Sequence, residues 1–160
     1  NEPDISDKPS NITDHAPSMS QQQISQLQLD YEGRAGSLCA VDDHVKQLVQ
    51  TLRDTHQLKN TLIVFTSDNG WLQGQHRITG DKFLPYEESI RVPFVLRGPG
   101  IPAGETVDGQ VSNIDFAPTL VDEAKAVAGR TMDGVSLMPT VRDPSKVPNR
   151  AIELAVELQK

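Results

Sequence analysis

The stretch TLIVFTSDNGWLQGQHRITGDKFLPYEESIRVPFVLR, residues 61–97, decides the fold, because two short apolar runs enclose a long polar loop. In the first run, residues 61–66, aliphatic, aromatic and β-branched side chains follow one another without alternation. This pattern is typical of a strand that is buried on both faces of a parallel sheet. Residues 93–97 form a second short run, which predicts another buried strand.

Polar side chains gather directly after the first of these runs. In parallel sheets of α/β proteins, functional groups lie at the carboxyl ends of the strands. The residues that follow the run are Ser67, Asp68, Asn69 and Gly70. The loop then adds further donors, acids and ligands: Gln75, His76, Arg77, Lys82, Glu87 and Glu88. The sequence therefore predicts a functional site in this loop.

The composition limits the kind of protein. With 160 residues, the chain has the size of one domain. Its formal net charge of -7 argues against nucleic-acid binding, because no basic stripe can neutralise phosphates, and it suits the binding of a cation. No apolar run approaches the roughly 18 residues that a membrane span needs. The single cysteine, Cys39, excludes an internal disulfide.

The chain divides into four regions. Residues 1–19 are polar and bear prolines, which predicts a loop without regular structure. Residues 20–54 predict one long helix, because a seam of apolar side chains recurs at steps of three and four: Ile24, Leu27, Tyr31, Leu38, Val41, Val45, Leu48 and Leu52. Residues 61–112 hold the strands and the polar loop, with a candidate third strand at 106–112. Residues 113–160 hold a helix and a tail.

Two local predictions concern the helices. The second helix is expected from about residue 115 to residue 126, with Ser112, Asn113 or Asp115 as its candidate cap. Cys39 lies beside Leu38 in the long helix, and the simplest interpretation is a packed thiol.

The tripeptide Asp68-Asn69-Gly70 has two interpretations. A carboxylate and an amide side by side offer hard oxygens, which suit Ca²⁺ or Mg²⁺ better than a soft metal. Asn-Gly is also a common turn pair, and taken alone the tripeptide favours a plain turn. A hairpin is not expected, because residues 71–82 do not return as a paired strand. His76 and Lys82 could donate to an anionic oxygen, although each viewed alone is more often a solvated loop residue.

The combination of motifs resembles a known family, the type I sulfatases. The matching segments, in the order and near the spacing of the carboxyl-side half of the sulfatase catalytic domain, are SDNG, GQHR, DKFLPYEESIRVPFVLRGPGIPAG, VSNIDFAPTL and MDGVSLMPTV, together with EPDISDKP and AVDDHV. The resemblance covers nearly the whole chain, and residues 61–104 are its specific part. It implies an α/β fold of the alkaline phosphatase-like superfamily with a mainly parallel sheet flanked by helices. It also implies Ca²⁺ as cofactor and the hydrolysis of sulfuric esters, as in arylsulfatases.

The resemblance assigns roles to individual residues. Asp68 and Asn69 match two of the Ca²⁺ ligands, and the remaining ligands are aspartates of an earlier family segment that these residues do not include. Lys82 matches the lysine that contacts the sulfate oxygens and the bridging oxygen, and His76 matches a histidine that faces the substrate group. A second set of matches is interpreted as supporting the site: Glu87, Glu88 and Arg91.

One family feature is missing. Sulfatases use a formylglycine nucleophile made within a Cys/Ser-x-Pro-x-Arg motif, and this chain contains no such motif. Cys39 is followed by Ala40 and Val41 and is not assigned as the nucleophile. Because the motif and the earlier aspartates both belong to the amino-side half of the family domain, we expect that half to be the missing partner. The 160 residues alone are then expected to hydrolyse no sulfate ester.

Two alternatives to a sulfatase remain open from the sequence. Phosphonate and phosphate monoester hydrolases of the same superfamily share the Asp-Asn pair, and the nucleophile that separates the classes lies outside the chain. A non-catalytic domain could instead bind a sulfated ligand through His76 and Lys82. The motifs do not identify the ester, so the partner is expected to be a sulfated small molecule or glycan.

Overall fold

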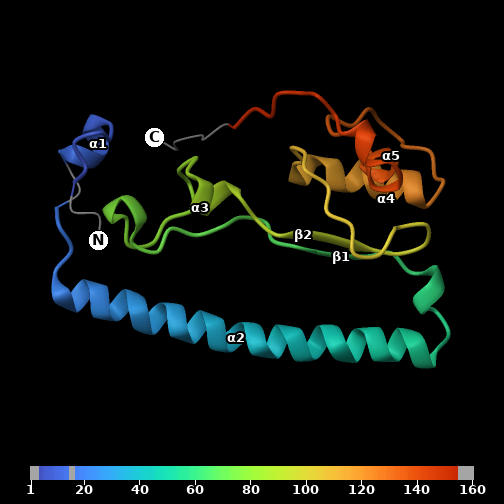
Figure 1. Cartoon of the computed structure of the whole chain (residues 1–160), viewed down its shortest axis with the longest axis horizontal. Coiled ribbons are helices and arrows are strands. Elements are labelled where there is room, and N and C mark those ends of the chain that lie inside the picture. The colour runs from blue at the N-terminus through green and yellow to red at the C-terminus, as the bar shows by residue number, and fades with distance from the viewer. Residues whose placement is uncertain (1–3, 15–16, 155–160) are drawn as a thin grey trace. The chain divides into compact units, whose positions relative to one another are not determined.

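The computed structural model describes residues 4–14 and 17–154 of the chain, and these residues form two compact units. The first unit takes in residues 4–58 and 66–94, with the helices α1 (Ser10–Thr13), α2 (Gln21–Asp54) and α3 (Glu87–Ile90). The second takes in residues 59–65 and 95–154, with α4 (Phe116–Glu123), α5 (Met138–Arg142) and most of the strands β1 (Ile63–Thr66) and β2 (Phe94–Arg97) (Figure 1). None of the described helices is long and apolar enough to cross a lipid bilayer.

The long helix predicted from residue 20 is present as α2, one continuous helix of 34 residues (Figure 1). Its start is set locally by a capping box, in which the Ser20 hydroxyl accepts from the Gln23 amide at 3.3 Å. The Gln23 side-chain oxygen in turn accepts from the Ser20 amide at 2.9 Å. Beyond Asp54 the chain leaves the helix, and His56 takes a positive φ of 58°. Local signals therefore define both ends of α2.

Most residues of the apolar seam of α2 are exposed. No residue of α2 is buried, and Leu38 and Leu48 are 60% and 51% exposed. Cys39 is also exposed, so the prediction of a packed thiol is wrong. Periodicity shows which residues share a helix face, whereas burial also needs a second apolar surface against that face. Near the start of the helix, Leu27 and Met19 both approach Gly74.

The two strands β1 and β2 pair with each other, but they run antiparallel, so the prediction of a parallel sheet is wrong for this pair (Figure 1). A parallel pair needs a crossover that carries the chain back to its starting edge. Here α3, a single turn, precedes β2, and the chain re-enters the sheet in the opposite direction. β1 is half-buried at its start and exposed at its end, rather than buried on both faces.

Other predicted regions differ in detail. Residues 106–112 form no strand in the described structure, and residues 1–19 include the one-turn helix α1 among the residues that are described. The predicted helix near residues 115–126 is confirmed as α4, which continues directly from a 3₁₀ turn, η3 (Asn113–Asp115). The tail is described only to residue 154, and the prediction for its last residues lies outside the described part.

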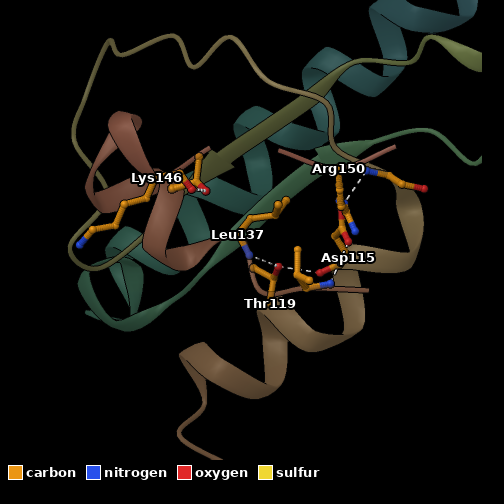
Figure 2. Close-up of polar contacts among 8 residues, drawn as sticks. Asp115, Thr119, Leu137, Lys146 and Arg150 are labelled. Atoms are coloured by element: carbon orange, nitrogen blue, oxygen red, sulfur yellow. Dashed lines mark hydrogen bonds and ion pairs between the residues drawn. The ribbon is translucent and has the colours of Figure 1, made fainter. Parts of the chain in front are cut away.

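A buried polar cluster around Asp115 holds the second unit together (Figure 2). Asp115 is 0% exposed. Its two carboxylate oxygens accept from the amides of Ser112 and Val135, each at 2.9 Å, and it forms an ion pair with Arg150. The neighbouring Thr119 adds a relay, because its hydroxyl donates to the Asp115 carbonyl at 2.6 Å and accepts from the amide of Leu137 at 2.9 Å. Two segments distant in sequence, residues 135–137 and the region of Arg150, are thus tied to the start of α4.

The Asp115 cluster predicts a specific acid sensitivity. Burial alone raises the pKa of the Asp115 carboxyl, but the hydrogen bonds from Arg150, Val135 and Ser112 outweigh it and leave the pKa below its usual value of 3.8. A depressed folded-state pKa contributes stability above pH 3.8, and this contribution is lost as the pH falls through the folded value. We expect the unfolding free energy of the chain to fall below about pH 4. Urea titrations of the chain and of Asp115→Asn at pH 7, 5 and 3 test this, since the variant should lose less stability to acid; equal losses would contradict it.

Candidate functional site

The short helix α3 is the hub of the candidate site, and the polypeptide after β1 is attached to it through the backbone. The amide of Gly70 donates to the carbonyl of Ser89 at 2.7 Å, and the amide of Trp71 donates to the carbonyl of Glu88 at 2.7 Å. Position 70 leaves no room for a side chain, because a Cβ there would lie 2.0 Å from the Glu88 carbonyl oxygen. Glycine is thus required for this close approach.

Asp68 and Asn69 lie in the turn between β1 and this attachment point. The Asp68 carboxylate is exposed, and its Oδ1 accepts from the amide of Asn69 at 2.9 Å. The Ser67 hydroxyl donates to the carbonyl of Asn69 at 2.8 Å, and the Asn69 side-chain amide donates to the carbonyl of Gly70 at 2.8 Å. The bond to Gly70 orients the Asn69 side chain, because its nitrogen is used inside the turn and its oxygen Oδ1 remains as an acceptor.

Lys82 reaches the same place from the other arm of the loop. Its ammonium Nζ donates to Asn69 Oδ1 at 3.3 Å, across a separation of 13 residues. The two arms are joined by an antiparallel bridge between Leu72 and Asp81, with a hydrogen bond of 2.8 Å. The expectation that residues 71–82 do not pair is therefore wrong at this one bridge. Leu72 is 0% exposed, and this buried anchor explains why the arms close.

His76 is held in a strained backbone at the tip of the loop. It lies in η2 (Gln75–Arg77), and both His76 and Arg77 have positive φ angles, 53° and 61°. Side chains with a Cβ adopt this region at a cost, and such strain persists where the surroundings enforce it. Here the imidazole stacks on Tyr86 with ring centroids 4.1 Å apart, and its Nε2 lies 3.7 Å from the Glu88 carboxylate. The His76 side chain is 19% exposed.

The structure thus separates the predicted site residues into two groups. Asn69 and Lys82 are brought into contact, and His76 and Glu88 form a second pair on the same hub. The exposed Glu87 and Arg91 pair only loosely with each other, at 3.4 Å on the surface of α3. Such exposed pairs contribute little to stability.

Four residues of this region were assigned no role from the sequence: Arg34, Trp71, Tyr86 and Ser89. The Arg34 guanidinium of α2 lies 5.7 Å from the centroid of the Trp71 ring, a cation–π arrangement. One signal was available for Arg34, because it occupies a seam position where the helical period calls for an apolar residue. The hydrogen-bond partners of Ser89 are backbone groups of Lys82 and Gly70, and no pattern in the sequence marks them.

The oxygen atoms of Asp68 and Asn69 supply part of the ligand set that a hard divalent cation needs. The Asp68 carboxylate and the Asn69 amide oxygen are of the kind that Ca²⁺ prefers. Two ligands fall short of the six to eight oxygens that Ca²⁺ takes. Among the residues that the structure describes, no three His, Cys, Asp or Glu side chains gather into a metal-binding group. The residues present therefore fit one side of a calcium site that needs further ligands.

Comparison with known proteins decides the family. A family model described as Sulfatase matches residues 6–126, which is most of the chain. The chain belongs to the sulfatase family. The resemblance inferred from the motifs is thereby confirmed, and the strands, α2 and the site loop are part of a sulfatase fold of the alkaline phosphatase-like superfamily.

Similar proteins place this sulfatase segment within much longer chains. It is 41% identical over 142 residues to an N-acetylglucosamine-6-sulfatase of Homo sapiens, covering 88% of this chain and 26% of that protein. It is 37% identical to an arylsulfatase of Volvox carteri, with 85% and 22% covered. The segment therefore spans about a quarter of the length of these curated relatives.

Solved structures of similar fold are also much longer than the part that this chain covers. A structure of BT4656 in complex with its substrate D-glucosamine-2-N,6-O-disulfate is 38% identical, with a TM-score of 0.64, over 70% of this chain and 23% of that one. A phosphonate monoester hydrolase from Silicibacter pomeroyi is 29% identical, with a TM-score of 0.62, over 70% and 22%. The fold is thus shared by sulfatases and phosphonate hydrolases.

Proposed function

We propose that this segment supplies part of the Ca²⁺ site and the sulfate-contacting groups of a sulfuric ester hydrolase. The observation that carries the proposal is the contact between Lys82 Nζ and Asn69 Oδ1, at 3.3 Å. It places a fixed positive charge next to an oxygen suited to a hard cation. A tetrahedral anion such as the singly charged sulfate ester group is the kind of ligand that such a pair attracts.

Asp68 and Asn69 are the residues of this segment that would hold Ca²⁺. When bound, the ion supplies positive charge that offsets the negative charge of the sulfuryl oxygens. Lys82 then donates hydrogen bonds to the sulfate oxygens and to the bridging oxygen, where charge develops as the ester bond breaks. Because Lys82 is anchored by α3 before substrate arrives, little reorganisation is needed during the reaction.

His76 is proposed as a second donor on the substrate side. Its stacking on Tyr86 and its approach to Glu88 restrict the ring. When protonated, the ring can give a proton to the departing alcohol oxygen. Lys82 and His76 thus share the task of stabilising the leaving group, with Lys82 as the principal donor.

The nucleophile is proposed to come from outside these residues. No Cys/Ser-x-Pro-x-Arg motif occurs in the chain, and the exposed Cys39 on α2 donates only to the carbonyl of Ala35, at 3.7 Å, among its described hydrogen bonds. A formylglycine is therefore expected in a sulfatase that contains these residues together with that motif, here called the complete enzyme. The 160 residues by themselves are expected to be inactive.

The substrate class is proposed to be a sulfated sugar. Similar proteins include N-acetylglucosamine-6-sulfatases, and the structure of BT4656 holds a disulfated glucosamine. The complete enzyme should hydrolyse 4-nitrophenyl sulfate and a 6-sulfated glucosamine in preference to the matching phosphate esters. A strong preference for phosphate or phosphonate esters would overturn the proposal.

A phosphonate monoester hydrolase is the second candidate, and one observation favours it. Two such hydrolases match the fold, from Silicibacter pomeroyi at 29% identity and from Agrobacterium radiobacter at 33%. An Asp-Asn pair beside a lysine suits a phosphonate monoanion as well as a sulfate ester. The same paired assay, with a phosphonate monoester added, separates the two candidates.

Removal of the Asp68 carboxylate tests the metal role. In the complete enzyme, Asp68→Ala should weaken Ca²⁺ binding by more than about tenfold, which corresponds to more than about 1.4 kcal/mol, because a charged ligand is lost. Calorimetric titration of the metal-depleted protein with Ca²⁺ measures this directly. Asp42→Ala removes an exposed carboxylate of α2 and serves as the control. Equal affinities of the two variants would count against Asp68 as a ligand.

A further inference from the structure

We propose that Ser89 is a positioning residue that sets where Lys82 meets Asn69, an inference that rests on the function proposed above. Ser89 lies in α3 and is 3% exposed, so it touches no solvent-borne ligand. It acts instead on the two arms that carry the proposed calcium ligand and the sulfate-binding lysine.

The contacts of Ser89 reach both arms at once. Its hydroxyl donates to the carbonyl of Lys82 at 2.5 Å, and its own carbonyl accepts from the amide of Gly70, next to Asn69, at 2.7 Å. One residue thus bridges the two polypeptide segments through atoms that lie close together on its backbone and Cβ. Together with the bridge between Leu72 and Asp81, Ser89 therefore sets the separation between the segments.

The Lys82 peptide is held from its other side as well. The carboxylate of Asp81 accepts from the amides of Lys82 and Phe83, at 2.6 Å and 2.8 Å. The amide and the carbonyl of Lys82 are both engaged, so the direction of its Cα–Cβ bond is set. A lysine side chain is flexible, with four methylene groups before the charge. Fixing its origin is therefore the main way in which the protein can control where Nζ lies.

Small displacements of a reacting group at such a site lower the reaction rate strongly. Moving a reacting group by about 1 Å can reduce a rate by about 10²-fold. Removal of the Ser89 hydroxyl would take away the donor that holds the part-buried carbonyl of Lys82 and free the arm to shift. The effect should appear in the chemical step, since Lys82 is proposed to stabilise the leaving oxygen, and much less in calcium binding.

The second unit provides a matched control. Thr140 is 4% exposed, and its hydroxyl donates to the main-chain carbonyl of Lys146 at 2.8 Å. The chemistry is the same as at Ser89: a buried hydroxyl on a lysine carbonyl. Thr140→Val removes this bond while keeping the shape of the side chain, and Thr140 has no place in the proposed site.

The experiment compares Ser89→Ala, Ser89→Cys and Thr140→Val in the complete enzyme, with kcat and KM measured on 4-nitrophenyl sulfate and on an alkyl or sugar sulfate. Ser89→Ala should lower kcat about 10- to 100-fold on the ester with the poorer leaving group, and clearly less on the nitrophenyl ester. KM and Ca²⁺ affinity should stay within about twofold of the wild type. Thr140→Val should leave all of these values unchanged.

A double substitution shows whether Ser89 acts through Lys82. In the Lys82→Met background, Ser89→Ala should cause little further loss of kcat, because the group that it positions is already gone. If Ser89→Ala does not fold, Ser89→Cys replaces it in the test, because cysteine keeps a weak donor of similar size. An intermediate loss of kcat for Ser89→Cys would then support the positioning role. Additive losses in the double variant, or equal losses on both esters, would overturn the positioning role. A silent Lys82→Met would instead overturn the proposed function itself.

Discussion

Replacing Lys82 by methionine in the complete enzyme should lower kcat on sulfate esters by about 10²- to 10³-fold, the usual cost of losing one donor to developing negative charge. Methionine keeps an unbranched apolar stem and removes the ammonium, so the change isolates the charge. The Nζ contact to Asn69 Oδ1 at 3.3 Å is lost at the same time. Because the cation also repels Ca²⁺, calcium affinity should stay equal or rise slightly.

Steady-state kinetics on a nitrophenyl and a sugar sulfate, with calcium titration alongside, measure the effect of Lys82→Met. Lys46→Met removes an exposed lysine of α2 and is the matched control, expected to retain full activity. A rise in KM with unchanged kcat would show that Lys82 binds the ground state only. That result, or no effect at all, would remove Lys82 from the proposed leaving-group role.

The largest effect on stability is expected at Asp115. Asp115→Ala should reduce the unfolding free energy of the chain by about 3–5 kcal/mol, because removing one partner of a buried ion pair leaves the other uncompensated. The remaining partner is Arg150, whose side chain is 20% exposed. The amides of Ser112 and Val135 also lose their acceptors. Urea unfolding followed by circular dichroism measures the loss.

Two further variants give the Asp115 prediction its control. Asp115→Asn keeps the shape and one acceptor oxygen, so it should lose less stability than Asp115→Ala. Combining Asp115→Ala with Arg150→Met should recover part of the loss, because the stranded guanidinium is then gone. If Asp115→Ala lowers the unfolding free energy by less than about 1 kcal/mol, water replaces the carboxylate, and the cluster does not hold the second unit together.

Local features of the fold could be predicted from the sequence, and non-local ones could not. The helix α2 was predicted from its apolar period, and the capping box at Ser20 that the structure shows is also a local feature. The prediction of the strand direction failed, because the direction of β2 depends on how residues 67–93 return the chain to the sheet. Asp115 was recognised only as a candidate cap for α4, since its bonds to Val135 and Arg150 join segments far apart in the chain.

The candidate site shows the same division. The sequence could indicate Asp68, Asn69 and Lys82, because their side chains carry charges or ligand oxygens and lie in recognisable motifs. The contact of Lys82 with Asn69 needed the structure, because it depends on the bridge from Leu72 to Asp81. The role of Ser89 could not be predicted from the sequence, because its partners are peptide groups, which every residue possesses.

The tight fit at Gly70 has a consequence for engineering. A library that randomises the loop to change substrate preference should leave position 70 untouched, because every other amino acid would place a carbon 2.0 Å from the Glu88 carbonyl oxygen. Trp71, the next residue, is 40% exposed and projects from the same anchored backbone. Adjacent positions thus differ in mutational tolerance: a substitution at Trp71 meets no such backbone clash, and its cost is the loss of the ring contacts with Arg34 and Gly80.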